Sequence, residues 1–235
     1  MTKNAVITGA TKGIGYAILT SLAKDGYSIG FCSRSKKDVD DLVSVLVKEY
    51  PDQKFVGLPC DISIKEELEA FATQMLVKLG SVDVLMNNGG VFLPGEISNE
   101  EVGNLELMMN TNLYSAYHLT RAILPSMKSN HRGHVINMCS VASQIAYPNG
   151  GSYSISKFAL LGFSKVLREE MKPYNIKVTS LLPGATWSDS WKGVDLPENR
   201  LMQADDIAKL VMCALSMSDS ATIEDIVIRP QLGDL

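Results

Sequence analysis

Short apolar runs alternate with longer amphipathic segments along almost the whole chain. The apolar runs, which predict buried β-strands, cover residues 5–8, 27–32, 54–58, 83–87, 134–139, 176–182 and 224–229. Between them, apolar side chains recur with the period of an amphipathic helix, over residues 14–22, 39–50, 68–79, 102–128 and 205–217. A further helix is expected at residues 153–157, between the fifth and sixth runs. This alternation predicts an α/β fold: a doubly wound parallel sheet with helices on both faces. Ligands of such folds bind beyond the carboxyl ends of the strands.

The composition is that of an ordinary globular protein. The chain has 235 residues and no linker-like stretch, so we expect one domain over residues 1–235. It is 46% hydrophobic and 20% charged, and a net charge of -4 does not favour nucleic-acid binding. The first apolar run is too short for a signal peptide, and no run is long enough to cross a bilayer. We therefore expect a cytoplasmic protein with no nucleic-acid or membrane partner.

The cysteine and histidine residues give no sign of a metal site. The four cysteines and three histidines are scattered along the chain, without the short spacings of metal-binding motifs. The sequence therefore predicts small buried cysteines in a reducing compartment and no bound metal.

A glycine-rich turn joins the first strand to the first helix. Its three glycines would let the backbone turn tightly and approach a pyrophosphate, whose negative charge the helix N-terminus attracts. The turn therefore predicts a dinucleotide site, with a merely structural turn as the alternative. We expect the cofactor to contact Gly9, Thr11, Lys12, Gly13, Ile14 and Gly15.

The second strand ends in a basic segment, where folds that prefer NAD usually have an acidic residue for the ribose hydroxyl. Arg34 and Lys12 supply two cations there, and a guanidinium suits a 2′-phosphate. NADP(H) is therefore favoured over NAD(H), with Ser33 and Ser35 as hydroxyl donors. A solvated basic loop is the alternative, because the next residues are charged in any case. Further contacts, at the adenine ring, are expected from Asp61 and Ile62.

A tyrosine and a lysine, Tyr153 and Lys157, lie four residues apart on one face of a predicted helix. An ammonium beside a phenol favours the phenolate, which would make Tyr153 a proton donor or acceptor near neutral pH. Ser140, at the end of the fifth strand, would hold a substrate oxygen. A half-buried tyrosine covered by a lysine stem is the alternative. Asn112 is unfavourable in the middle of the long helix, so it needs either a function or a buried hydrogen-bond partner.

The order and spacing of these motifs resemble the short-chain dehydrogenase/reductase family over residues 3 to about 188. Residues 8–15 resemble its glycine-rich motif, and residues 87–90 resemble its Asn-Asn-Ala-Gly element. The resemblance implies a Rossmann fold with seven strands in the order 3-2-1-4-5-6-7. It implies a catalytic set of Asn112, Ser140, Tyr153 and Lys157. It also implies cofactor contacts from Asn88, Gly89, Tyr153, Lys157, Pro183, Gly184 and Thr186.

Three features depart from the family pattern. Gly89 stands where the family usually has alanine, which we expect to be tolerated with a looser turn. The last strand lacks the usual glycine-rich ending, and the tail is more similar to that of sepiapterin-reductase-like and carbonyl-reducing members. Residues 185–203 form a substrate lid that is short for the family, which suggests an open pocket. The lid carries Trp187 and Trp191, for which packing of a surface loop is the alternative.

Together these residues predict NADPH-dependent reduction of a ketone or aldehyde, in which Ser140 holds the carbonyl oxygen and Tyr153 donates the proton. Lys157 would assist and hold the cofactor ribose, and Asn112 would position a water. The same residues would serve an NADP-dependent alcohol or hydroxy-acid dehydrogenase, or a 3-oxoacyl reductase. A regulatory protein that binds NADPH without catalysis is the alternative from another class. The resemblance further implies a homodimer or homotetramer.

Overall fold

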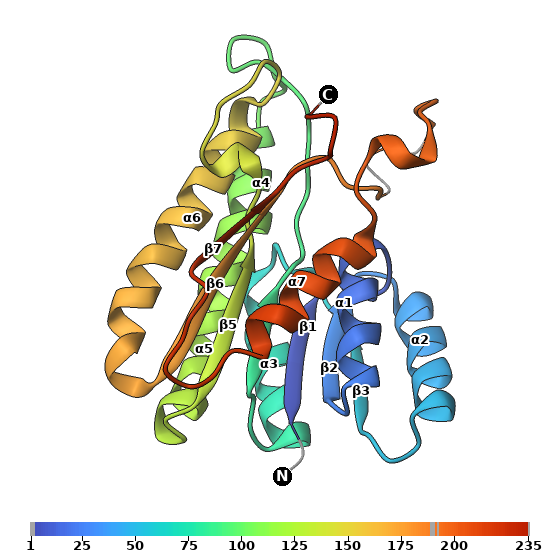
Figure 1. Ribbon diagram of the computed structural model, residues 1–235, viewed down its shortest axis with the longest axis vertical. Helices are drawn as coiled ribbons and strands as arrows, with labels where there is room; N and C mark the ends of the chain where they lie inside the picture. The colour runs from blue at the N-terminus through green and yellow to red at the C-terminus, as the bar shows by residue number, and fades with distance from the viewer. Residues whose placement is uncertain (1–2, 189–190, 192, 235) are drawn as a thin grey trace.

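A computed structural model describes residues 3–188, 191 and 193–234 as a parallel sheet between two layers of helices (Figure 1). The strands are β1 (Asn4–Thr8), β2 (Ser28–Ser33), β3 (Phe55–Pro59), β4 (Val84–Asn87), β5 (Gly133–Met138), β6 (Ile176–Pro183) and β7 (Asp225–Ile228). The α-helices are α1 (Gly13–Lys24), α2 (Lys36–Glu49), α3 (Lys65–Leu79), α4 (Asn104–Met109), α5 (Ser115–Ser129), α6 (Gly151–Met171) and α7 (Ala204–Leu215). Short helical turns are η1 (Asn110–Tyr114), η2 (Val141–Ser143), η3 (Lys172–Tyr174) and η5 (Glu198–Arg200).

The sheet has seven strands in the order β3-β2-β1-β4-β5-β6-β7, and every neighbouring pair is parallel. This confirms the strand order that the sequence predicted. Every residue of β1 is buried, as expected of a central strand with helices on both faces, whereas β7 at the edge is at most half-buried. The order reverses between β1 and β4, and this is the place where doubly wound sheets bind their ligands.

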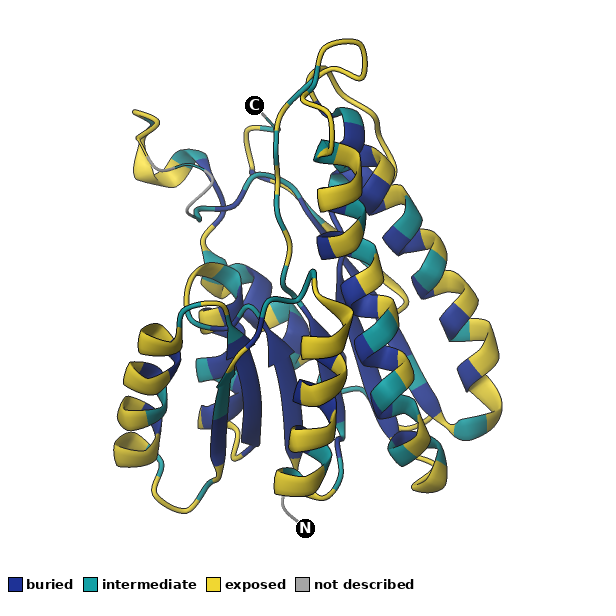
Figure 2. Cartoon of the chain, turned by 180° about the vertical axis from the view of Figure 1, so that it is seen from behind, coloured by how far each residue is buried: buried dark blue, intermediate teal, exposed yellow. Residues whose placement is uncertain are grey.

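Two large clusters of apolar side chains fill the two sides of the sheet, and a smaller third one lies between α5, α6 and β6. One large cluster joins the sheet to α1, α2 and α7, and the other joins it to α3, α5 and the end of α6. Figure 2 shows the result from behind: the strands are buried, and the outer faces of the helices are exposed. The doubly wound arrangement predicted from the hydrophobic pattern is therefore the observed one.

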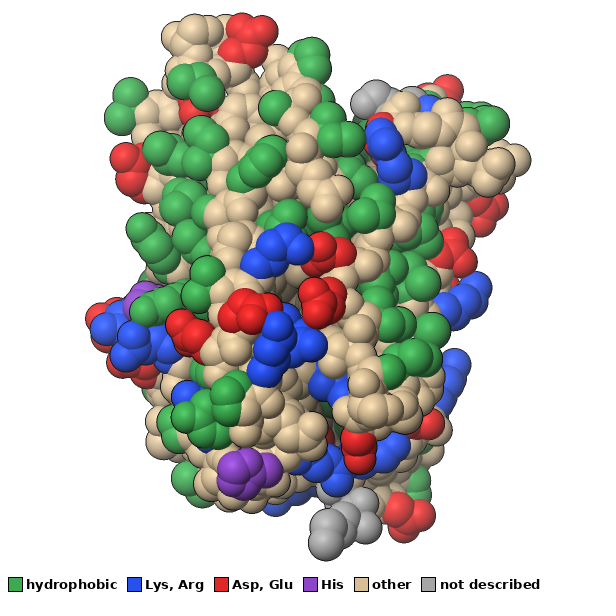
Figure 3. Space-filling view, turned by 60° about the vertical axis from the view of Figure 1, so that its left-hand side comes forward, with side chains coloured by type: hydrophobic (Ala, Val, Ile, Leu, Met, Phe, Trp, Pro, Cys, Tyr) green, Lys and Arg blue, Asp and Glu red, His purple; other side chains and the backbone are tan. Residues whose placement is uncertain are grey.

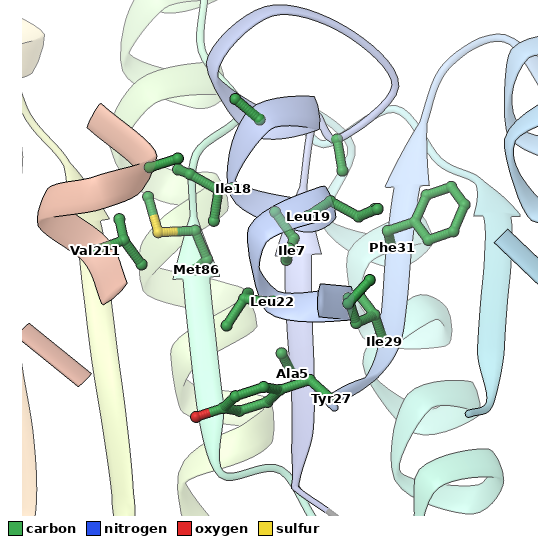
Figure 4. Packing of buried hydrophobic residues seen from close by; sticks show 14 of the residues in the cluster. Ala5, Ile7, Ile18, Leu19, Leu22, Tyr27, Ile29, Phe31, Met86 and Val211 are labelled. Atoms are coloured by element: carbon green, nitrogen blue, oxygen red, sulfur yellow. The ribbon is translucent and has the colours of Figure 1, made fainter. Parts of the chain in front are cut away.

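The packing of α1 on the sheet shows how the period of apolar residues becomes a core (Figure 4). Ile18 and Leu22, one helical turn apart, are fully buried beside Met86 of β4, and Val211 of α7 closes the cluster. Burial of each such side chain contributes about 1.5–3 kcal/mol relative to exposure. This packing fixes α1, and with it the glycine-rich turn at its N-terminus.

The single long helix expected over residues 102–128 is interrupted. Gly103, with a left-handed φ of 97°, precedes α4, and one π-helical turn, η1, separates α4 from α5. The π turn contains Asn112, whose side-chain amide bonds to the backbone of a neighbouring loop. A π turn inserts a residue into the helical ladder and is common at functional sites. The periodicity of apolar residues cannot show such an insertion, because the helix continues on both sides of it.

Within the described residues, no helix is both long enough and apolar enough to cross a membrane. The same residues contain no group of three or more histidine, cysteine, aspartate or glutamate side chains placed to hold a metal ion.

Candidate active site

The residues predicted to bind and react follow the carboxyl ends of four neighbouring strands. Gly9 follows β1, Asn88 follows β4, Ser140 follows β5, and Gly184 follows β6. Because the strands are parallel, these ends meet at one edge of the sheet, the upper one in Figure 1. The fold therefore gathers at one edge motifs that are far apart in the sequence.

The glycine-rich turn is closed by backbone packing. Gly9 and Gly13 have left-handed φ angles of 66° and 57°, which favour glycine. A Cβ atom at Gly15 would lie 2.2 Å from the carbonyl oxygen of Gly9 and 2.5 Å from the amide nitrogen of Asn88. The N-cap residue of α1, Lys12, makes no side-chain cap to the helix. The first N–H groups of α1 therefore border a tight backbone turn, which suits a phosphate group.

Asn88 holds the turn from the neighbouring strand. Its side-chain amide donates to the carbonyl oxygens of Thr8 and Gly9, each at 3.0 Å. The hydroxyl of Thr8 in return accepts hydrogen bonds from the backbone N–H groups of Asn88 and Gly89, at 3.1 and 2.9 Å. Asn88 thus ties β4 to the glycine turn, a role that its spacing does not indicate. A contact of Asn88 with the cofactor stays a prediction.

Gly89, the residue that departs from the family pattern, has a structural explanation. A Cβ atom there would lie 2.4 Å from Cδ1 of Ile62 and 3.3 Å from the hydroxyl of Thr8. Ile62 therefore fills the space that an alanine methyl group would take. Glycine at this position lets Ile62 pack closely against the backbone. The contacts therefore indicate a tightly packed turn, where we expected a looser one.

The basic segment after β2 lies beside the glycine turn. The hydroxyl of Thr11 donates to that of Ser33 at 3.1 Å, and Ser35 caps α2 by accepting from a backbone N–H at 3.2 Å. The lysines that follow pair with aspartates one turn along α2. Arg34 is exposed beside Asp61. Partial burial acts to raise the pKa of Asp61, but hydrogen bonds from Ser63 and the charge of Arg34 outweigh it and lower that pKa.

Asn112 is buried, and both the oxygen and the nitrogen of its side-chain amide form hydrogen bonds. Its side-chain oxygen accepts from the N–H of Val91 at 2.8 Å, and its nitrogen donates to the Val91 carbonyl at 3.0 Å and to the Ser156 hydroxyl at 2.9 Å. The amide therefore joins the π turn, the loop after β4 and α6. These contacts fit the alternative of a satisfied buried amide. Asn112 and Lys157 both border Gly90: the position of a Cβ there lies 3.0 Å from the Asn112 oxygen and 3.6 Å from the Lys157 ammonium.

Lys157 is anchored inside the protein. Only 5% of it is exposed, and its ammonium donates to the carbonyl oxygen of Met138, the last residue of β5, at 2.7 Å. The ammonium lies 5.8 Å from the centre of the Tyr153 ring. An ammonium has three donors, so the bond to Met138 leaves capacity for further acceptors. The strand end therefore holds a buried positive charge next to the phenol.

Tyr153 lies in the first turn of α6, and two residues that the sequence analysis missed hold this region. The ring of Phe92, in the loop after β4, meets the Tyr153 ring edge to face, with 4.8 Å between centres. The carboxylate of Glu100 accepts hydrogen bonds from the hydroxyl of Ser152 and, at 3.4 Å, from its backbone N–H. Glu100 thus stabilises the N-terminus of α6, where a negative charge is favourable. Neither residue could be found from the sequence, because Glu100 lies 52 residues from Ser152 and Phe92 is still farther along the chain from Tyr153.

Ser140 follows the end of β5 and is the N-cap of η2. Its backbone is extended, and its hydroxyl oxygen accepts from the N–H of Ala142 at 3.1 Å. The hydroxyl of Ser143 accepts from the N–H of Ser140 at 3.2 Å, which completes a capping box around η2. With one acceptor site of its oxygen used in this way, the hydroxyl hydrogen of Ser140 can point to a substrate oxygen.

The segment after β6 runs from the nicotinamide side of the predicted site to the proposed lid. The hydroxyl of Thr186 donates to the carbonyl oxygen of Gly184 at 3.0 Å. Farther on, Cβ of Ser188 lies 3.9 Å from the position of a Cβ at Gly13, so this segment lies beside the glycine turn. The indole N–H of Trp187 donates to the carbonyl of Glu198 within the lid, at 2.7 Å. Residues 189, 190 and 192 of the lid are outside the described residues.

Tyr147 lies in the segment between η2 and α6, near Tyr153. Its partial burial, together with the charges of Tyr153 and Asp234, raises the pKa of Tyr147 to about 12. Its hydroxyl therefore stays protonated at neutral pH. The sequence suggested Tyr147 as a pocket residue, but nothing in the sequence indicated that Asp234 would come near it.

Comparison with known proteins agrees with this geometry. The family model of short chain dehydrogenases matches residues 3–199. The chain belongs to the short-chain dehydrogenase/reductase family and is an oxidoreductase, as its motifs suggested. Among relatives, the sepiapterin reductase of Chlorobaculum tepidum is 30% identical, over 98% of this chain and 97% of that protein.

Solved structures of the family have the same fold. An alcohol dehydrogenase from the archaeon Thermococcus sibiricus, complexed with 5-hydroxy-NADP, has a TM-score of 0.91 with 28% identity and covers 100% of this chain and 99% of its own. A 7α-hydroxysteroid dehydrogenase complexed with NADH and 7-oxo glycochenodeoxycholic acid has a TM-score of 0.88 with 27% identity and covers 99% of this chain and 94% of its own. The Rossmann-type sheet predicted from the sequence is confirmed by these similarities.

Proposed function

We propose that this protein reduces a ketone or aldehyde to an alcohol with NADPH. The observation that carries the proposal is the buried ammonium of Lys157, which is anchored to the carbonyl of Met138 and lies beside the ring of Tyr153. A buried charge of this kind is costly unless it is compensated or used. Its position next to a phenol in the first turn of α6 supports a proton-transfer site.

The residues at the carboxyl edge of the sheet support binding of a nicotinamide dinucleotide. The glycine turn leaves no room for a Cβ at Gly15 and exposes the N-terminus of α1, as close approach of a pyrophosphate requires. Lys157 has donors left for a ribose hydroxyl. The family resemblance assigns Thr186, which bonds to the carbonyl of Gly184, to the carboxamide. When bound, such a cofactor supplies or accepts the hydride.

A preference for the phosphorylated form rests on the end of β2. The acidic residue that binds the ribose of NAD is absent from this segment, and Arg34 is exposed beside the glycine turn with Ser33 and Ser35 on either side. A guanidinium gives two parallel hydrogen bonds to a phosphate. The Thermococcus sibiricus enzyme is complexed with an NADP derivative and the hydroxysteroid dehydrogenase with NADH, so the fold itself does not decide the preference.

The chain's own residues act on the substrate oxygen. The hydroxyl of Ser140 donates a hydrogen bond to the carbonyl oxygen and polarises it. Tyr153 then gives its proton to the same oxygen as the alcohol forms, and the ammonium of Lys157 stabilises the negative charge left on the phenol. Asn112 holds the π turn against α6 and keeps the Lys157 region in place. The same residues, in the reverse direction, oxidise an alcohol.

The substrate is a small molecule in this proposal, and the protein forms a homodimer or homotetramer. Several large hydrophobic side chains on η1, α5 and α6 are exposed: Tyr114, Tyr117, Ile155, Phe158 and Val166. In Figure 3, which turns the α6 side forward, hydrophobic side chains gather on the upper part of this face. An apolar surface of this kind supports contact with a second copy of the chain.

Loss of NADPH absorbance with a panel of ketones and diketones tests the activity. Tyr153→Phe should lower turnover about 10²- to 10⁴-fold, the usual contribution of a positioned acid, while the Kd for NADPH stays nearly the same. Tyr174→Phe is the matched control, because Tyr174 lies in η3 before β6, at the opposite edge of the sheet. Near-normal reduction by Tyr153→Phe would refute the proton-donor role. Tight NADPH binding by the native chain with no turnover of any compound would favour the regulatory alternative.

A further inference from the structure

The chain after β7 returns to the site and lies over the segment that follows β6. We call residues 229–234 the strap and residues 185–203 the lid. The N–H of Gly184 donates to the carbonyl of Ile228 at 2.8 Å. A Cβ atom at Gly184 would lie 2.4 Å from Oδ1 of Asp234 and 3.1 Å from Cδ of Pro230. The strap is therefore packed directly on the backbone of Gly184, beside the predicted nicotinamide contact.

The strap is folded on itself. Nε of Arg229 donates to Oδ2 of Asp234 at 2.7 Å, and a second guanidinium nitrogen bonds the same oxygen. The N–H of Gly233, which has a left-handed φ of 81°, donates to the carbonyl of Pro230 at 2.9 Å. These bonds close a compact turn in which the charges of Arg229 and Asp234 compensate each other.

The strap holds the lid through one side chain. Arg200, in η5 near the end of the lid, donates from Nη1 to the carbonyl of Gly233 at 2.9 Å and from Nη2 to that of Asp234 at 3.3 Å. A guanidinium has a planar set of donors, so it can hold two successive carbonyl groups at once. Arg200 is half-buried, and both of its acceptors are backbone atoms of the strap.

The lid is also closed at its base, next to Arg200. The N–H of Trp187 donates to the carbonyl of Met202 at 2.9 Å, and the N–H of Met202 donates to that of Ala185 at 3.2 Å. The side-chain nitrogen of Gln203 and the indole N–H of Trp187 both donate to the carbonyl of Glu198. These hydrogen bonds connect the base of the lid with η5. Loss of the Arg200 contact should therefore also change the surroundings of Trp187.

The strap also comes near Tyr147, in the segment before α6. The charge of Asp234 acts on the phenol of Tyr147, on which the charge of Tyr153 acts as well. The strap therefore contacts the lid through Arg200 and also comes near Tyr147.

We propose that the strap braces the lid over the substrate pocket and that Arg200, which joins the two, is a positioning residue for substrate binding. This inference rests on the proposed function, because the pocket is the one beside Tyr153. Arg200 acts through the lid and takes no part in proton transfer. Its loss should therefore raise the KM for the carbonyl substrate and change kcat little.

The chain offers a readout of the lid that does not depend on activity. It contains two tryptophans, Trp187 and Trp191, and both are half-buried in the lid. Tryptophan emission therefore reports the lid alone. Arg200→Ala and deletion of residues 231–235 break the same contact from its two sides. Arg132→Ala is the matched control: it also removes a guanidinium, from a pair with Asp83 at the other end of the sheet.

Both changes should shift tryptophan emission to longer wavelength and raise the KM about tenfold, as expected for the loss of two hydrogen bonds to neutral groups. The doubly altered chain should behave like the deletion alone, because without residues 231–235 Arg200 has no strap carbonyl left to hold. The deletion also removes the Arg229–Asp234 pair, so its effect should be at least as large as that of Arg200→Ala. Arg200→Lys, which can hold one carbonyl, should recover part of the effect. Far-UV circular dichroism verifies that each variant folds. If Arg200→Ala does not fold, the deletion of residues 231–235 still tests the contact.

Two results would overturn the brace: emission and KM in Arg200→Ala equal to those of Arg132→Ala, or effects of the two changes that multiply in the doubly altered chain. Failure of the proposed function is recognised separately. If the native protein reduces no carbonyl compound but both changes still shift the emission, the brace stands and the enzymatic proposal fails.

Discussion

The two ends of the candidate site are stabilised by different interactions. At the cofactor end, Gly9 and Gly15 are six positions apart, and a Cβ at Gly15 would clash with the backbone of Gly9 in a tight turn. At the substrate end, Arg200 reaches Gly233 across 33 positions and holds the lid by hydrogen bonds at a half-exposed surface. Backbone packing allows almost no substitution, whereas two side-chain bonds can be exchanged at little cost. The cofactor end is therefore the constrained part of the site, and the substrate end is the part that can vary.

The sharpest test of this difference is Gly15→Ala. Its Cβ would lie 2.2 Å from a backbone oxygen that cannot move without opening the turn, so we expect a loss of about 3 kcal/mol or more in unfolding free energy and a large loss of NADPH affinity. Urea unfolding and a binding titration measure both. Gly89→Ala is the control, because its Cβ meets the flexible end of Ile62 and should cost far less. Equal costs for the two variants would contradict the backbone argument.

Acid should weaken the sheet through His134. Burial and, to a smaller extent, the charge of Lys177 lower the pKa of His134 to about 4, and its Nε2 lies 2.7 Å from the hydroxyl of Thr179. The unfolded chain, with a histidine pKa near 6.5, binds a proton that the folded one does not. Stability is thus complete above pH 6.5 and falls toward pH 4, by about 3 kcal/mol in total.

Urea unfolding followed by circular dichroism across this pH range measures the loss. His134→Gln should remove most of the slope, whereas His118→Gln, on the surface of α5, should keep it. Since His134 is in the sheet and both tryptophans are in the lid, far-UV and emission changes separate the two regions. A slope that persists unchanged in His134→Gln would assign the acid sensitivity to other groups.

Arg34→Ala tests the preference for NADPH over NADH at the cofactor end. If its guanidinium binds the 2′-phosphate, the Kd for NADPH should rise about 10- to 100-fold, as for a lost charged hydrogen bond, while that for NADH stays the same. Isothermal titration with both cofactors gives the two values. Lys37→Ala is the control, because Lys37 pairs with Asp41 on α2. An equal effect on both cofactors would remove the argument for NADPH.

The smallest effect is expected from Glu100→Gln, which keeps the hydrogen-bonding shape at the start of α6 and removes the charge. The loss of a favourable charge at a helix N-terminus should lower kcat roughly two- to fivefold through the placement of Tyr153. Steady-state kinetics with saturating NADPH measure this change. Glu101→Gln, at an exposed neighbour, should have no effect. The same kcat in both variants would restrict Glu100 to a structural role.

The sequence was sufficient for the sheet and for the positions of the main motifs. The strand order followed from the alternation of elements and the family resemblance, and Ser140 was correctly placed at a strand end. The π turn at Asn112 was missed, because an inserted residue leaves the apolar stripes on both sides in place. Phe92 and Glu100 were missed because their roles depend on partners that only folding brings near.

The sequence by itself determined which residue types stand at the ends of the strands, since hydrophobic period and glycine position act over a few neighbouring residues. Only the tertiary structure decided how the amide of Asn112 is used, which carbonyl anchors Lys157 and what the strap contacts. These contacts join segments many residues apart. A long-range contact depends on how the elements pack, and the local sequence at either partner does not contain that information.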